Sequence, residues 1–95
     1  MYYVITNQER TNKMDTAIIY LSYRICTQRL VIKETGEVYE FHSEAMEFKN
    51  QLANMRNILK RDEGFTFGRV CLVDDFTWHQ GLDQCAVYEA EIKYL

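Results

Sequence analysis

Apolar and polar residues alternate in several segments of the chain, and this pattern predicts strands. Residues 2–6, 16–26 and 65–73 are rich in aromatic and β-branched residues, which favour pleated sheet. Gly68 marks a bulge in the third of these segments. From Ala86 to Tyr94 every second residue is apolar or aromatic, which predicts a last strand with one buried and one solvent-exposed face. Residues 7–13 and 74–84 are mostly polar, and we expect them to be irregular loops.

The segment 16–26 allows two interpretations. Apolar residues at positions 19, 21, 23 and 25 alternate with more polar neighbours, as is typical of a strand. The same segment permits a short helix capped by Asp15 or Thr16, with Ile18, Leu21 and Ile25 on one side. The strand is favoured because Ile, Tyr and Thr fill the segment.

Residues 30–41 predict a β-hairpin around the sequence Glu-Thr-Gly-Glu. Gly36 can adopt the positive φ that a tight hairpin needs. A three-residue loop would place Ile32 opposite Val38, and a two-residue loop would place Ile32 opposite Tyr39. Both registers give favourable cross-strand pairs, so the sequence leaves both open.

An amphipathic helix is predicted from Ser43 to Arg61. Ser43 is a good N-cap, and Gly64 can close the helix at its other end. Basic residues near that end, Arg56 among them, complement the helix dipole. One stripe at helical spacing is apolar and should face the core: Ala45, Phe48, Leu52, Met55 and Leu59.

The order of these elements predicts an α+β fold. Strands joined by short turns favour a mainly antiparallel sheet, of about five or six strands, packed against the helix Ser43–Arg61. The 95 residues contain no linker-like or low-complexity stretch, and 47% of them are hydrophobic. We therefore expect residues 1–95 to form a single domain.

Composition narrows the classes of function. The net charge of −3 and the lack of a dense basic tract argue against nucleic-acid binding. No apolar run is long enough for a transmembrane helix, and the first residues do not resemble a signal peptide. Three widely spaced cysteines favour reduced thiols over a disulfide framework, so we expect a cytoplasmic protein.

Catalytic or metal chemistry has weak candidates. Cys85 with His79 and Asp83 could form a thiol site, and the adjacent Asp74 and Asp75 could serve acid–base chemistry or a hard metal. Structural thiols and a solvated strand end explain these residues more simply. The potential zinc ligands lack the close paired spacing of a zinc site: Cys26, Cys71, Cys85, His42 and His79. The glycines are isolated, so no nucleotide fingerprint is present, and we expect no metal or other cofactor.

Tyrosines on strands offer another class of function, which is the binding of single-stranded nucleic acid by base stacking. The candidates are Tyr2, Tyr3, Tyr20, Tyr23, Tyr39 and Tyr88. Core packing is the simpler role for these rings.

The leading hypothesis is a small, non-enzymatic protein-binding module. Phe76 and Trp78 stand in a polar segment, where large apolar side chains often anchor interfaces, although Trp78 could instead fold back onto the core. The predicted contact surface comprises Phe76, Trp78, His79, Asp74, Asp75 and Asp83. Size and type suggest an inhibitor or regulatory accessory factor, of the kind that phages or mobile elements direct against a host defence or nucleic-acid-processing protein. Unpaired strand edges also leave homodimerisation open.

Overall fold

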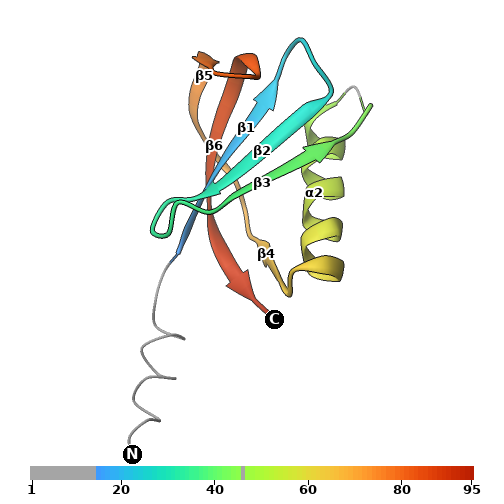
Figure 1. Cartoon of the computed structure of the whole chain (residues 1–95), viewed down its shortest axis with the longest axis vertical. Helices are drawn as coiled ribbons and strands as arrows, with labels where there is room; N and C mark the ends of the chain where they lie inside the picture. Colours follow the sequence, from blue (N-terminus) through green and yellow to red (C-terminus); the bar gives the residue numbers. More distant parts are fainter. Residues whose placement is uncertain (1–14, 46) are drawn as a thin grey trace, which may run out of the picture.

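One helix packs against a curled antiparallel sheet in the computed structural model of the chain, which describes residues 15–45 and 47–95 (Figure 1). The α+β prediction is confirmed. The predicted strand 2–6 and loop 7–13 lie outside the described residues. The elements in chain order are β1 (Thr16–Ser22), β2 (Thr27–Ile32), β3 (Val38–His42), α2 (Phe48–Asp62), β4 (Phe65–Phe67), β5 (Cys71–His79) and β6 (Asp83–Tyr94).

The sheet is organised around its longest strand, β6. The strand order is β3-β2-β1-β6-β4, and β5 also pairs with β6. Along one side of β6, β4 pairs with its C-terminal end and β5 with its N-terminal part, both antiparallel. The predicted strand 65–73 is therefore interrupted at residues 68–70, where the Gly68 N–H still donates to the Glu91 carbonyl (3.0 Å).

The prediction of an irregular loop over residues 74–84 was wrong. Strand β5 continues to His79, and β6 already begins at Asp83. Strands are recognised by an alternation of apolar and polar residues, which arises when one face is buried and the other is exposed. Strand β5 is an edge strand that is exposed along most of its length, so its sequence need not alternate in this way.

The hairpin between β2 and β3 adopts neither predicted register. Leu30 lies opposite Tyr39 and Val31 opposite Val38, so the turn is one residue longer than the longer predicted loop. The Ile32 carbonyl accepts the N–H of Gly36 (2.7 Å), and the Ile32 N–H donates to the Glu37 carbonyl (2.9 Å). Gly36 has the predicted positive φ, 79°.

Strand β1 confirms the favoured interpretation of its segment but ends at Ser22. The Ser22 hydroxyl oxygen accepts the backbone N–H groups of Arg24 and Ile25, each at 3.1 Å. These side-chain bonds replace ladder bonds and turn the chain out of the sheet.

The helix begins at Phe48, five residues later than predicted, and Glu47 rather than Ser43 is its N-cap. The Ser43 N–H donates to the Cys26 carbonyl (3.0 Å), which keeps Ser43 next to the sheet instead of at the helix. The other end agrees with the prediction, because Gly64, with φ of 78°, donates its N–H to the Leu59 carbonyl (3.0 Å).

The core lies between α2 and one face of the sheet. Leu52, Met55 and Leu59 of the predicted stripe are buried, whereas Phe48 at the first turn is only partly buried and Ala45 precedes the helix. The sheet contributes the rest of the buried cluster: Ala17, Ile19, Leu21, Leu30, Ile32, Phe41, Phe65, Phe67, Ala90 and Ile92.

Arg56 joins α2 to the interruption between β4 and β5. Its guanidinium donates to the carbonyls of Phe67 (3.1 Å) and Gly68 (2.9 Å) and lies 4.5 Å from the centre of the Phe67 ring. The sequence pattern indicated only a helix-dipole role for Arg56. In the structure it holds the chain where β4 ends, and so directs β5 along β6.

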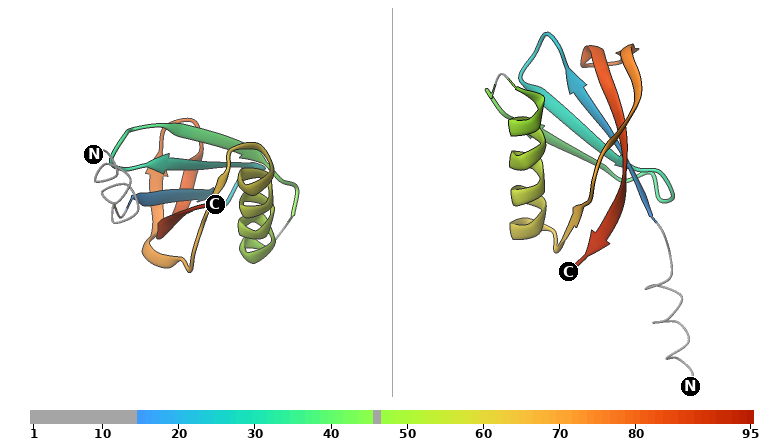
Figure 2. Two further views of the ribbon diagram at one scale, coloured as in Figure 1. Left: turned by 90° about the horizontal axis from the view of Figure 1, so that it is seen from below. Right: turned by 180° about the vertical axis from the view of Figure 1, so that it is seen from behind.

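The turn between β5 and β6 folds toward the other face of the sheet. Arg29 on β2 donates to the Gln80 carbonyl (2.9 Å) and to Glu40 (2.9 Å), and Tyr20 stacks on His79 with ring centres 3.9 Å apart. Leu82, the last residue of the turn, is buried. These contacts fix the orientation of the β5–β6 hairpin, whose turn is set apart from α2 in Figure 1 and in the right view of Figure 2.

Candidate protein-binding surface

Strand β5 exposes large apolar side chains along an open sheet edge. Among the described residues it pairs with β6 alone. Leu72 is 54% exposed, Val73 56%, Phe76 64% and Trp78 62%. Single exposed apolar residues are common on proteins, but several on one strand indicate a contact surface.

Three of these side chains share one face. Leu72 lies opposite Tyr88 and Trp78 opposite Gln84, and residues 84 and 88 are on the same face of β6. Phe76 is two residues from Trp78 and lies on that face as well. It is the face that α2 covers farther along the sheet, so the helix leaves the hairpin end of this face open (Figure 2).

An aromatic row connects β5 to the start of the helix. The ring of Tyr23, in the β1–β2 turn, lies 5.1 Å from the Phe48 ring and 5.4 Å from the Phe76 ring, between ring centres. The Tyr23 hydroxyl donates to the Asp75 carboxylate (3.0 Å). Burial and this hydrogen bond raise the pKa of Tyr23. Tyr23, Leu72, Asp75, Phe76 and Trp78 together are called the β5 surface below.

Asp74 and Asp75 lie where β5 is irregular. The pairing with β6 shifts between Leu72 and Asp74 and again between Asp74 and Thr77, so Asp74, opposite Val87, lies on the other face of the sheet from Leu72 and Trp78. The Thr77 hydroxyl and the backbone N–H of Phe76 lower the pKa of Asp74, which keeps this carboxyl ionised. No Lys or Arg of the described part of the chain forms a salt bridge with Asp74 or Asp75.

The predicted contact residues separate into two groups. Phe76, Trp78, Asp74 and Asp75 lie on the exposed strand, and the large exposure of Trp78 shows that it does not cap the core. His79 and Asp83 instead have partners within the chain. His79 is stacked on Tyr20, and Asp83 forms a salt bridge with Arg24 (3.3 Å). Burial, and then the nearby Arg29, lower the pKa of His79, so its ring is neutral at pH 7.

Cys85, His79 and Asp83 come close together without forming an activated nucleophile. Register places His79 opposite Asp83, and the Cys85 thiol donates to the Asp83 backbone carbonyl (3.5 Å). Cys85 is fully buried, and that burial raises the pKa of its thiol. A reactive cysteine needs an accessible thiolate, which this environment disfavours.

The other candidate sites are dispersed. Tyr20 lies on one face of the sheet, and Tyr39 and Tyr88 lie on the other, while Tyr2 and Tyr3 are outside the described residues. The tyrosines that the structure describes therefore form no continuous stacking platform. Over residues 15–45 and 47–95, no three Cys, His, Asp or Glu side chains are grouped closely enough to hold a metal ion.

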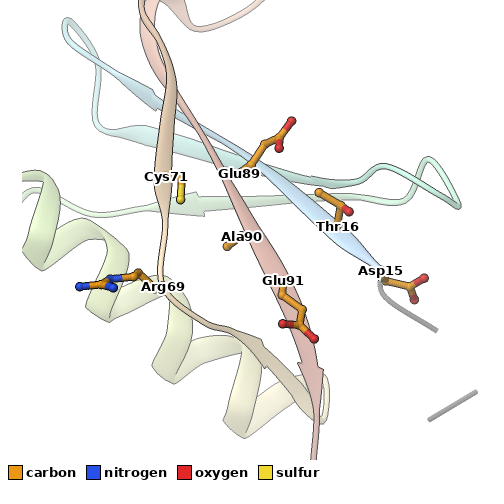
Figure 3. Close-up of a pocket in the computed structure, with 7 residues that line it drawn as sticks. All are labelled: Asp15, Thr16, Arg69, Cys71, Glu89, Ala90 and Glu91. Atoms are coloured by element: carbon orange, nitrogen blue, oxygen red, sulfur yellow. The ribbon is translucent and has the colours of Figure 1, made fainter. Parts of the chain in front are cut away.

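An open depression of about 280 Å³ lies on the sheet face opposite the helix (Figure 3). Glu89 and Glu91 of β6 line it together with Arg69 and Cys71, and Figure 3 shows Arg69 directed away from the two glutamates. Asp15 also lines the depression, and its carboxylate accepts a hydrogen bond from the Tyr94 hydroxyl. None of the predicted contact residues lines this depression.

Sequence reasoning missed Leu72 and Tyr23 as parts of the exposed surface. Leu72 had no local signal, because it shares a face with Phe76 and Trp78 only through the pairing with β6 and the two register shifts of β5. Tyr23 had no such signal, because its place beside Phe76 depends on the turn that Ser22 makes after β1.

Comparison with known protein families, with curated proteins and with solved structures finds no match to this chain. In the part of the chain that the structure describes, no helix is both long and apolar enough to cross a membrane.

Proposed function

We propose that this chain is a non-enzymatic protein-binding module that contacts its partner through the β5 surface and acts as an inhibitor or accessory factor. One observation carries the proposal. Leu72, Phe76 and Trp78 are each more than half exposed on one face of an edge strand. A folded chain gains nothing from leaving such side chains in water, whereas a partner that covers them gains their hydrophobic free energy.

The support of this surface is also typical of a binding site. Arg56 fixes the start of β5, Arg29 fixes the turn after it, and Tyr23 packs against Phe76 from the side. Side chains presented from a fixed backbone lose little conformational entropy on binding. Aromatic anchors of this kind account for much of the binding energy at protein interfaces.

Affinity capture with matched variants tests the proposal. The bait carries Phe76→Ala with Trp78→Ala, and the control bait carries Val38→Ala with Leu95→Ala, two apolar side chains exposed elsewhere on the molecule. We expect a specific protein to be retained by the wild type and by the control but lost by the Phe76/Trp78 variant. Identical capture by all three baits would refute the β5 surface as the contact.

Direct contact is tested by placing a photo-crosslinking amino acid at position 78 or at position 38. A crosslink to the captured protein from position 78 alone is the expected result. A crosslink from position 38 alone would assign the interface to the opposite sheet face.

A further inference from the structure

We infer that the β5 surface binds an extended segment of another protein in which an arginine lies between apolar side chains. This inference rests on the proposed function and adds the chemistry of the partner. It derives from one juxtaposition: the carboxylate of Asp75 adjoins the exposed rings of Phe76 and Tyr23.

The carboxylate of Asp75 attracts a cation that the described part of the chain does not supply. Asp75 is exposed, and no Lys or Arg among the described residues pairs with it or with Asp74 on the other face. Asp75 accepts the Tyr23 hydroxyl through Oδ1, which fixes the carboxylate beside the aromatic row. The chain is acidic overall, with a net charge of −3, so a basic partner is also favoured at long range.

Arginine fits this place better than a simple positive charge. Its guanidinium is planar and can stack on the exposed Phe76 ring while it donates hydrogen bonds to a carboxylate. Its aliphatic stem can cover apolar surface, which Leu72 offers on the same face of the strand. Apolar side chains on either side of the arginine would then cover Leu72 and Trp78.

The same features disfavour a second copy of this chain as the occupant. If two copies of β5 paired in antiparallel fashion about the middle of Cys71–His79, Asp75 would lie opposite Asp75 of the other copy. Like charges directly opposite each other destabilise a strand pair. The two register shifts in β5 also interrupt the regular edge that such pairing needs.

Selection from a random-peptide display library tests this inference and does not require the partner to be identified. The library is selected on the wild type, on Asp74→Asn with Asp75→Asn, on Phe76→Ala with Trp78→Ala, and on Glu63→Gln with Glu91→Gln. The last variant removes the same charge from exposed positions outside the β5 surface. Enriched peptides are then synthesised, and their affinities are measured by calorimetry at low and high salt.

We expect the wild type and the Glu63/Glu91 variant to enrich peptides with an arginine flanked by apolar residues. The Asp74/Asp75 variant should bind these peptides about tenfold more weakly or worse and should lose most of the salt dependence. Replacing the peptide arginine by lysine should also weaken binding, because stacking is lost.

Two failures can be told apart. Enrichment of apolar peptides without arginine, still dependent on Phe76 and Trp78, would overturn this inference and leave the proposed function standing. Peptides that bind the Phe76/Trp78 variant as well as the wild type, or no enrichment on the wild type at all, would count against both.

Discussion

Removing the two aromatic side chains of β5 should cost much less folding free energy than their size suggests, although these are among the largest apolar groups of the chain. Phe76 is 64% exposed and Trp78 62%, so folding has buried only the smaller part of each. A Phe or Trp side chain offers about 150–250 Å² of surface, which leaves roughly 250 Å² of the pair in water. At about 25 cal/mol per Å², this surface represents about 6 kcal/mol that only a partner can recover.

The expected loss of folding free energy is correspondingly small. Trp78→Ala should change the free energy of unfolding by about 0.5 kcal/mol or less, as surface substitutions do. Phe76→Ala also removes the ring contact with Tyr23, which adds about 0.5–1.5 kcal/mol. Leu59→Ala, at a fully buried position of α2, is the contrasting control and should cost about 2–5 kcal/mol.

Urea unfolding followed by circular dichroism measures these differences, and fluorescence tests their cause. Trp78 is the only tryptophan of the chain. Its emission in the folded monomer should therefore resemble that of tryptophan in water, should be readily quenched by acrylamide, and should shift little on unfolding. A strongly blue-shifted emission, or a loss of more than about 3 kcal/mol in Trp78→Ala, would refute this account of the exposed strand.

Three further predictions concern the support of the sheet and the charges of β5. Arg56→Lys keeps the charge but loses the two-pronged bond to the Phe67 and Gly68 carbonyls, so the free energy of unfolding should fall by about 1.5–3 kcal/mol in urea titrations. The hydrogen bond to Asp15, and then burial, raise the pKa of Tyr94 from an ordinary 10 to about 12. The folded state therefore favours the neutral phenol. The stability that this hydrogen bond contributes is complete below pH 10 and is lost as the pH rises toward 12. Tyr94→Phe should abolish this alkaline component in unfolding curves measured across that range, and an unchanged pH profile would contradict the assignment. Neutralising the acids of β5, by Asp74→Asn with Asp75→Asn, should increase self-association in sedimentation experiments, whereas equal sedimentation of variant and wild type would show that these charges do not prevent edge pairing.

The main packing of this fold could be predicted from sequence because it depends on periodic patterns. The helical spacing of Leu52, Met55 and Leu59 identified the buried side of α2. The alternation from Ala86 to Tyr94 identified the central strand β6. Such patterns occur wherever one face of an element is buried and the other is exposed, so they can be recognised without knowledge of the tertiary structure.

The errors arose where single hydrogen bonds decide the outcome. The helix start moved from Ser43 to Phe48 because the Ser43 N–H pairs with the Cys26 carbonyl, a bond between distant segments. The turn after Ile32 gained a residue through its bonds to Gly36 and Glu37. Neither the later helix start nor the longer turn can be recognised from the hydrophobic pattern.

The candidate site was identified by residue type but assigned to the wrong structure. Phe76 and Trp78 were noticed because large apolar residues in a polar segment are unusual. Their common face, and the position of Tyr23 beside them, follow from strand pairing with β6 that the sequence does not encode locally.

The position of β6 in the middle of the sheet has a consequence for how the protein is made. Ile19 of β1 pairs with Tyr88 of β6, and every partner of β5 in the described sheet also belongs to β6. During synthesis strands β1, β2 and β3 can form their meander early, but the second neighbour of β1 does not exist until β6 has been made. The nascent chain therefore pairs the exposed strand β5 only after residues 83–94 have left the ribosome.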